Sequence, residues 1–258
     1  MTSDVEPIID QPALRVKAGS ETSVVVADLH LGVEHAIAEA GVRIPGRTWT
    51  IQERLIGLCS REKADKLLIL GDVKHSVPGT SWQEKQELPE FFRGIQRQVG
   101  RVEIAVGNHD TYLRELLPGE IVFHEPDGFS YNGIGFVHGH MWPSKETVDN
   151  EVIVLAHNHP TITLVDELGV SHNYPCWVRG TAVPDKMKER YGDGLRTAVP
   201  EVIMIPSFLE FGSGTVVNEK DQRLLGPFLN NGFLDLMRSK VFLLDGTLLG
   251  FVESLILD

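Results

Sequence analysis

The sequence has few cysteines and no long apolar segment. These absences argue against a disulfide-stabilised secreted scaffold and against a membrane-spanning protein. Its only cysteines, Cys59 and Cys176, lie far apart in a chain of 258 residues. A small secreted scaffold held together by disulfides would need more of them. Free, buried thiols in a cytoplasmic protein are therefore the favoured interpretation, and a single Cys59–Cys176 disulfide is the alternative. We expect no membrane association, because no apolar run could cross a bilayer and the acidic start lacks a signal-peptide pattern.

Positive charge is also scarce. The chain has 24 Lys and Arg against 36 Asp and Glu, a formal net charge of −12. Proteins that bind nucleic acid usually present a basic surface, since phosphate contacts supply much of their affinity. This balance argues against tight, non-specific binding to a duplex. It leaves open a local basic groove, or a metal centre that binds the phosphate itself.

Strands and amphipathic helices alternate in the first half of the chain. The pattern predicts strands at 24–27, 67–70 and 104–106, and helices at 49–62 and 82–99. Pro89 is expected to kink or break the second helix. The order strand–helix–strand–helix–strand indicates parallel strands with helices on the outside.

Strand candidates crowd together after residue 111. They cover residues 135–137, 152–156, 161–165, 176–179, 202–205, 241–244 and 247–252. Surface loops or short helices are expected at 181–200 and 218–231. We predict an α/β fold in which a two-sheet β-sandwich is flanked by helices. Residues 1–258 would form a single domain, with 181–258 as a candidate C-terminal extension or subdomain. A domain after residue 160 could cap the site or mediate homodimer formation.

Six of the ten histidines lie in short blocks beside other metal-binding residue types. In chain order the blocks are Asp28-Leu29-His30, Gly71-Asp72, Gly107-Asn108-His109-Asp110, His138-Gly139-His140 and His157-Asn158-His159. Each block directly follows a predicted strand, and ligand sites in α/β sheets collect at the carboxyl ends of strands. Carboxylates, an amide and several imidazoles make a ligand set for two metal ions. They point to a hydrolase that acts on phosphate esters.

The ordered series DLH, GD, GNHD, HGH and HNHP resembles the motifs of the calcineurin-like metallophosphoesterases. Within that family, GDVKH is similar to the G-D-x-x-H form of the SbcD-type nucleases, and HNHPTITLVDELGV is similar to the archaeal SbcD-related phosphoesterases. The last motif of the family usually begins with glycine, whereas this chain has Ala156. A small residue still lets the backbone approach closely.

The resemblance implies a role for each matching residue. Two divalent metal ions would be held, the first by Asp28, His30 and His159 and the second by Asn108, His138 and His157. Asp72 would bridge both ions together with a hydroxide that attacks the phosphorus atom. Manganese is the expected metal, with iron or zinc as alternatives, because oxygen and imidazole ligands without thiolate suit these ions.

Other residues would act on the substrate. By resemblance, His109 would bind phosphate and protonate the leaving group, Asp110 would orient His109, and His75 would stabilise the transition state. For His75, a surface-loop histidine is the alternative. Arg43, Arg47 and His140 are candidate substrate contacts. The alternative for the two arginines is a solvated loop, and His140 is expected beside the metal ligands rather than among them.

Charge favours one substrate class. Two divalent ions, two aspartates and one hydroxide leave a small positive charge, which one phosphodiester would neutralise. A phosphomonoester would need help from Lys or Arg, and only Lys74 adjoins the blocks. The leading hypothesis is a nuclease-like phosphodiesterase acting on single-stranded DNA or RNA. The alternatives are a phosphatase or cyclic-nucleotide phosphodiesterase for small molecules, and a phosphoesterase-like scaffold without catalysis.

Overall fold

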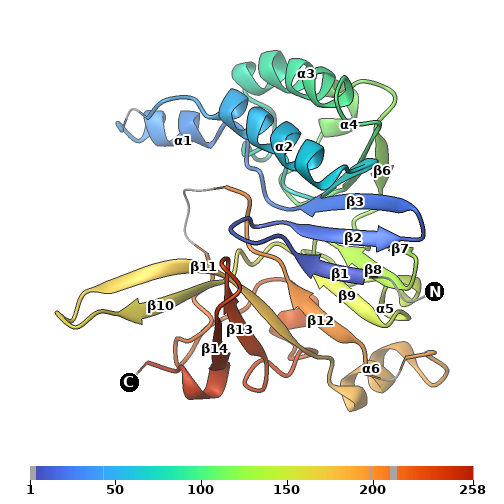
Figure 1. Ribbon diagram of the computed structural model, residues 1–258, viewed down its shortest axis with the longest axis vertical. Helices are drawn as coiled ribbons and strands as arrows, with labels where there is room; N and C mark the ends of the chain where they lie inside the picture. Colours follow the sequence, from blue (N-terminus) through green and yellow to red (C-terminus); the bar gives the residue numbers. More distant parts are fainter. Residues whose placement is uncertain (1–3, 43, 198, 210–213, 258) are drawn as a thin grey trace.

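Two β-sheets pack face to face, and helices cover their outer sides (Figure 1). This computed structural model describes residues 4–42, 44–197, 199–209 and 214–257. Both sheets contribute to the buried layer between them, in which Val25 and Leu68 of the first sheet meet Phe136 and Trp177 of the second. The predicted α/β sandwich flanked by helices is therefore confirmed.

The first sheet has six strands in the order β1-β2-β3-β4-β5-β6. They are β1 (Asp4–Pro7), β2 (Leu14–Ala18), β3 (Glu21–Val26), β4 (Lys66–Leu70), β5 (Arg101–Ala105) and β6 (Val122–His124). β3 to β6 pair in parallel, whereas β1 and β2 extend the sheet in antiparallel fashion. The accompanying helices are α1 (Val33–Glu39), α2 (Thr48–Glu62), α3 (Trp82–Gln96) and α4 (Leu113–Leu116).

Side-chain alternation explains how this sheet is buried on both faces. Val24 and Val26 of β3 pack under the helices, whereas Val25 and the following Ala27 face the second sheet. All four are fully buried. The continuous apolar run is therefore that of a strand covered on both sides, as the sequence predicts.

The second sheet contains the remaining strands. They are β7 (Phe129–Tyr131), β8 (Ile134–Val137), β9 (Val152–Leu155), β10 (Thr161–Val165), β11 (Ser171–Thr181), β12 (Glu201–Met204), β13 (Lys240–Leu243) and β14 (Leu248–Phe251). Their order is β14-β13-β11-β12-β9-β8-β7, and β10 forms a hairpin with β11. Short helices complete this half: α5 (Lys145–Val148), α6 (Pro184–Tyr191), α7 (Pro227–Asn230) and the 3-10 turn Val252–Ser254. Strands from beyond residue 181 thus lie inside the sheet, with β12 between β11 and β9.

Helix α3 spans Trp82–Gln96 without interruption at Pro89, so of the predicted kink or break, the break is absent. Two features compensate for the backbone hydrogen bond that proline cannot make. Ser81 and Glu84 form a reciprocal capping box at the start of the helix. The aromatic pair Phe91 and Phe92 is completely buried just beyond the proline.

The two cysteines lie on opposite outer sides of the sandwich. Cys59 packs between the helices and the first sheet, whereas Cys176 packs on the outer face of the second. Both are buried free thiols, so the disulfide alternative is wrong. Within the described part of the chain, every helix is too short or too polar to span a membrane.

Candidate metal centre

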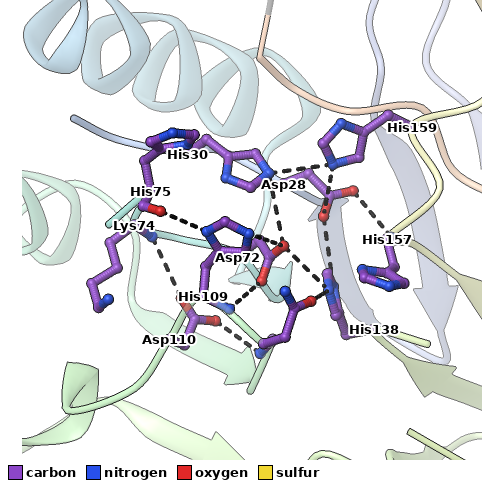
Figure 2. A network of polar contacts seen from close by, with 12 residues as sticks. Asp28, His30, Asp72, Lys74, His75, His109, Asp110, His138, His157 and His159 are labelled. Carbon is purple, nitrogen blue, oxygen red and sulfur yellow. Dashed lines mark hydrogen bonds and ion pairs between the residues drawn. The ribbon is translucent and has the colours of Figure 1, made fainter. Parts of the chain in front are cut away.

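The five predicted blocks meet at one edge of the sandwich, where β3, β4, β5, β8 and β9 end. Figure 2 shows their imidazoles and carboxylates pointing toward one another from these strand ends. Candidate ligand atoms of Asp28, His30 and His159 lie within 4.8 Å of one another. So do those of Asp72, His138 and His157. The structure therefore brings together two groups that each contain an aspartate and two histidines. A third set, made of histidines alone, consists of His30, His75 and His109.

The backbone is strained at this edge. Asp28, His30, Asp72, His157 and His159 all have left-handed conformations, with φ between 43° and 69°. Non-glycine residues rarely adopt this region, which costs about 1–2 kcal/mol for each residue. The cost must be met by the surrounding structure, and such strain is typical of sites where side-chain direction matters more than local stability.

Asp72 stands between the two groups. Its Oδ1 accepts the backbone N–H of His109 at 2.9 Å. Its Oδ2 lies 3.4 Å from His138 Nε2 and 3.7 Å from His30 Nε2, one histidine from each group. A carboxylate in this position can interact with cations held on either side. Glycine precedes it because a Cβ on Gly71 would lie 2.5 Å from His138 Nδ1.

The hydrogen bond behind the His138 ring leaves Nε2 to face the other candidate ligands. The ring is buried, and its Nδ1 lies 2.9 Å from the Leu70 carbonyl, to which it donates. In the neutral form that metal binding requires, Nε2 directs a lone pair toward Asp72 and toward Asn108 Oδ1, which is 3.2 Å away. In that form three acceptor atoms converge with no hydrogen among them. A metal ion would satisfy all three, and a carbonyl behind the ring is the usual support of a metal-binding histidine.

The other group fits a cation equally well. His30 Nε2 and His159 Nε2 are 3.3 Å apart, and His159 Nε2 is 3.4 Å from Asp28 Oδ1. Two nitrogens bound to one ion at about 2.0–2.1 Å would be separated by about 3.3 Å in a tetrahedral site. Asp28 Oδ1 is also buried without a hydrogen-bond partner. The residues present therefore fit two divalent ions.

Electrostatics shows what balances the charges when no metal is bound. Burial alone would lower the pKa of His138, but the carboxylates of Asp72 and Asp28 raise it to about 9. Burial likewise opposes ionisation of Asp72, yet His138 and His30 hold the pKa of this carboxyl well below its usual range. Burial lowers the pKa of His157 to about 4, so this ring is neutral at neutral pH. When no metal is bound, the proton on His138 therefore supplies positive charge that balances the carboxylates of Asp72 and Asp28.

His109 lies on the accessible side of the centre, with 25% of its side chain exposed. Its Nδ1 donates to the main-chain carbonyl of His75 at 2.6 Å, and its Nε2 lies 4.0 Å from Asp72 Oδ2. The expected role of Asp110 is corrected here. Its buried carboxylate accepts the backbone N–H groups of Val73 and Gly107, at 2.8 and 2.9 Å. Asp110 therefore fixes the surrounding loops, and the His75 carbonyl orients the His109 ring.

The other predicted contacts divide into two classes. The rings of His75 and His140 lie beside the ligands, with centroids 5.4 Å from His30 and 5.2 Å from His138, respectively. The surface-loop interpretation of His75 is therefore wrong. The backbone N–H of Arg47 donates to Glu34 Oε1 of α1 at 2.5 Å, and neither residue belongs to the groups of possible metal ligands. Arg43 lies outside the described residues.

Two supporting residues could not be recognised from the sequence. Ser207 Oγ donates to the main-chain carbonyl of Asp28 at 2.8 Å. Asn158, between two ligand-type histidines, exchanges two hydrogen bonds with the backbone of Leu225, at 2.7 and 3.1 Å. Segments distant in sequence therefore hold the Asp28 and His157–His159 loops. Their only sequence signal is the position of Asn158 inside a motif.

A model of the calcineurin-like phosphoesterase family matches residues 22–196, more than half of the chain. The chain belongs to the calcineurin-like phosphoesterases. This family consists of metal-dependent phosphoester hydrolases that use divalent ions, in agreement with the groups of Asp and His side chains at the sheet edge.

Comparison of this calcineurin-like phosphoesterase with solved structures finds similar chains at low sequence identity. The nuclease MPE of Pseudomonas putida has a TM-score of 0.54 and 18% identity, covering 94% of this chain and 98% of its own. YfcE, a phosphoesterase from E. coli, has a TM-score of 0.40 and 15% identity, covering 88% of this chain and 96% of its own. A search of curated protein sequences finds no significant match.

Proposed function

We propose that this protein is a dinuclear metal-dependent phosphodiesterase that cleaves nucleic acid. The observation that carries the proposal is the position of Asp72 Oδ2, which lies between His30 of one ligand group and His138 of the other. Asp28, His30 and His159 would hold one ion, and Asn108, His138 and His157 the second. Manganese is the expected metal.

When bound, two such ions would acidify a water molecule and neutralise charge on the phosphate. The chain's own residues would prepare the rest of the reaction. His109 keeps its Nδ1 proton on the His75 carbonyl, so its Nε2 faces the centre. In its doubly protonated form the ring would donate the Nε2 proton to the leaving oxygen and remain neutral with Nδ1–H in place. His75 lies next to His109, with ring centroids 5.6 Å apart, where it can contact the same phosphate.

The placement of Lys74 favours a diester over a monoester. This fully buried lysine adjoins the Asp72 block, yet its ammonium donates to the carbonyls of Ser76 and Gly79, the latter at 2.6 Å. It is therefore engaged by the loop rather than by the centre and does not add positive charge toward a substrate. The nuclease activity named for the P. putida protein of similar fold supports nucleic acid as the diester.

Turnover of bis-p-nitrophenyl phosphate after loading with Mn²⁺, Fe²⁺ or Zn²⁺ tests the reaction class. We expect His109→Ala to lower turnover by about a hundredfold, because a positioned general acid contributes about 10²–10⁴ in rate. Asp72→Asn should remove activity. His35→Ala, at an exposed histidine outside the centre, is the matched control and should behave like the wild type. Equal turnover in wild type and His109→Ala would reject the proposal.

A small-molecule phosphodiesterase or phosphatase is the second candidate, favoured by the net charge of −12. Single-stranded DNA, cyclic AMP and a set of phosphomonoesters should be compared at equal enzyme concentration. Nuclease activity that persists on repurification and disappears in Asp72→Asn decides for nucleic acid. Faster turnover of cyclic AMP or of monoesters, with no cleavage of DNA or RNA, decides for the alternative.

A further inference from the structure

The capping box of helix α3 contains a carboxylate with a second set of partners. Glu84 is 1% exposed, and its Oε2 accepts the Ser81 N–H at 2.6 Å, as a capping box requires. Its Oε1 accepts two further backbone N–H groups, from His75 at 3.1 Å and Ser76 at 2.8 Å. A helix cap alone does not explain these two bonds, since both amides belong to the loop that follows Asp72.

One peptide group connects Glu84 to His109. The Ser76 N–H and the His75 carbonyl belong to the same peptide unit, which is trans. In a trans peptide these groups point in opposite directions. Glu84 therefore lies on one side of the unit, and on the other side the carbonyl accepts the proton of His109 Nδ1 at 2.6 Å. The result is a continuous chain of carboxylate, peptide and imidazole.

We propose that Glu84 is a positioning residue for His109 and acts through the peptide group between His75 and Ser76. The inference rests on the proposed general-acid role of His109. A carboxylate bonded to the N–H end polarises a peptide and makes its carbonyl a stronger acceptor, since linked hydrogen bonds reinforce one another. The carbonyl then holds the Nδ1 proton and directs Nε2 toward the centre. Glu84 thus orients the His109 ring through a peptide, which is the role that the sequence predicts for Asp110.

Glu84 is suited to this role because it sits on a rigid element. Leu88 and Phe91, in the following turns of α3, are buried against the first sheet. The loop is also fixed near its start, where the His75 N–H donates to the Leu31 carbonyl at 3.0 Å. The peptide between His75 and Ser76 is therefore held on both sides, and among the described residues Glu84 is the charged acceptor of its N–H.

The test separates positioning from helix capping. Glu84→Gln keeps the size of the side chain but removes the charge and places an NH₂ group against at least one amide. Ser81→Ala removes the hydroxyl that accepts the Glu84 N–H, yet leaves the carboxylate and its bonds to the His75 and Ser76 amides. Ser81→Ala is therefore the matched control for a purely structural effect. Turnover would be measured on aryl methyl phosphates whose leaving phenols span several pKa units.

A good phenolate leaving group needs little protonation, whereas a poor one depends on the general acid. We expect Glu84→Gln to slow the poorest leaving group by about tenfold to a hundredfold and the best by less than about threefold, so that the rate depends more steeply on phenol pKa. Ser81→Ala should lower the melting temperature without changing this dependence. Folded, metal-loaded Glu84→Gln with the wild-type dependence would overturn the proposal.

Two controls keep this result separate from the proposed function. If His109→Ala also shows the wild-type dependence, general-acid catalysis fails, and the function must be revised first. If His109→Ala makes the rate depend more steeply on phenol pKa but Glu84→Gln does not, the positioning role of Glu84 is wrong and general-acid catalysis stands. Should Glu84→Gln not fold, ¹⁵N-histidine spectra of the wild type still decide. The proposal requires an Nδ1–H tautomer of His109 with a slowly exchanging proton, and an Nε2–H tautomer would overturn it.

Discussion

His138 carries a proton in the metal-free protein that a cation must displace. Its pKa is raised from 6.5 to about 9, so its ion pairs contribute fully to stability below about pH 6.5. That contribution is lost as the pH rises through about 9. Metal binding requires the neutral ring, so affinity changes in the opposite sense. From about pH 7 to about pH 9, we expect the metal-free melting temperature to fall and Mn²⁺ affinity to rise, by up to about tenfold per pH unit.

Calorimetry in the presence of a chelator, together with metal titrations in buffers of different ionisation enthalpy, measures both effects and the proton released. The same measurements on His35→Ala should reproduce the wild type, because this residue is exposed and lies outside both ligand groups. An affinity independent of pH over this range would show that His138 is already neutral before metal binds.

Ser207 supports a ligand loop without being a ligand. Its hydroxyl donates to the Asp28 carbonyl, where the backbone is in the left-handed region with φ of 55°. Ser207→Ala should weaken binding of the metal at Asp28, His30 and His159 by about tenfold, since outer partners of ligands typically contribute 10–100-fold. Competition with a chelating dye measures this affinity. Ser254→Ala removes a similar hydroxyl-to-carbonyl bond at the exposed Phe251 and should leave metal affinity unchanged.

At this scale the sequence predicts well which side chains gather at the centre, and it predicts their supports poorly. Aspartate and histidine are recognisable by type and by position after a strand, so the meeting of Asp28 and His157 at this edge could be predicted. Ser207 could not, because its role depends on a chain crossing from β12 to the end of β3. Asp110 was assigned to the wrong partner for the same reason. Its carboxylate turns toward amides of two loops, and adjacency in sequence says nothing of that direction.

At the scale of the element, helix α3 contains a proline that we expect to destabilise it. Pro89 is half-buried inside the helix and cannot donate a hydrogen bond to the Lys85 carbonyl. Pro89→Ala should raise the free energy of unfolding by about 1–3 kcal/mol, since proline costs about 3 kcal/mol relative to alanine in a helix interior. Urea denaturation measures the change.

Gln86→Ala, at an exposed position of the same helix, should change stability by less than about 0.5 kcal/mol. Loss of stability in Pro89→Ala would show that the ring itself packs favourably.

Long apolar elements were predictable, and short polar ones were not. β4 and β9 are nearly uniform runs of buried branched residues, and their predicted bounds agree with the structure to one residue. β1 and β2 were missed because each mixes charged and apolar residues and lies at or near the sheet edge, where one face or edge meets water. Such strands form because they pair with a neighbouring strand of the sheet. The local sequence pattern contains no information about that neighbour.

At the scale of the whole molecule, the layer between the sheets has two polar ends. The metal-type ligands gather at the carboxyl ends of the strands. Toward the opposite end, Lys66 is 1% exposed and lies 3.5 Å from Glu103 Oε1, with the ring of Tyr131 from the second sheet 3.7 Å away. Both layers of the sandwich follow from hydrophobic alternation. This second charged cluster does not, because its members belong to β4, β5, β6 and β7, and only the packed sheets bring them together.

Glu103 is the centre of that cluster and should be essential for stability but not for catalysis. It accepts hydrogen bonds from Arg101 at 2.9 Å and from His124 at 2.7 Å while facing Lys66. Burial opposes its ionisation, but His124 and Lys66 lower its pKa to about 2. Its contribution is therefore present above about pH 4.5 and is lost as the pH falls toward about 2.

Glu103→Gln would leave the buried Lys66 ammonium with the partly exposed Glu21, 3.4 Å away, as its remaining counter-charge, which should cost up to about 3 kcal/mol at neutral pH. The deficit relative to the wild type, followed by urea denaturation, should shrink as the pH is lowered toward about 3. Turnover of the folded, metal-loaded variant should stay within about twofold of the wild type, because the change lies at the far end of the strands from Asp72. Glu90→Gln removes an exposed partner of Arg93 and should cost less than about 1 kcal/mol. A loss of turnover in Glu103→Gln at unchanged stability would mean that the two polar ends communicate through the layer between the sheets.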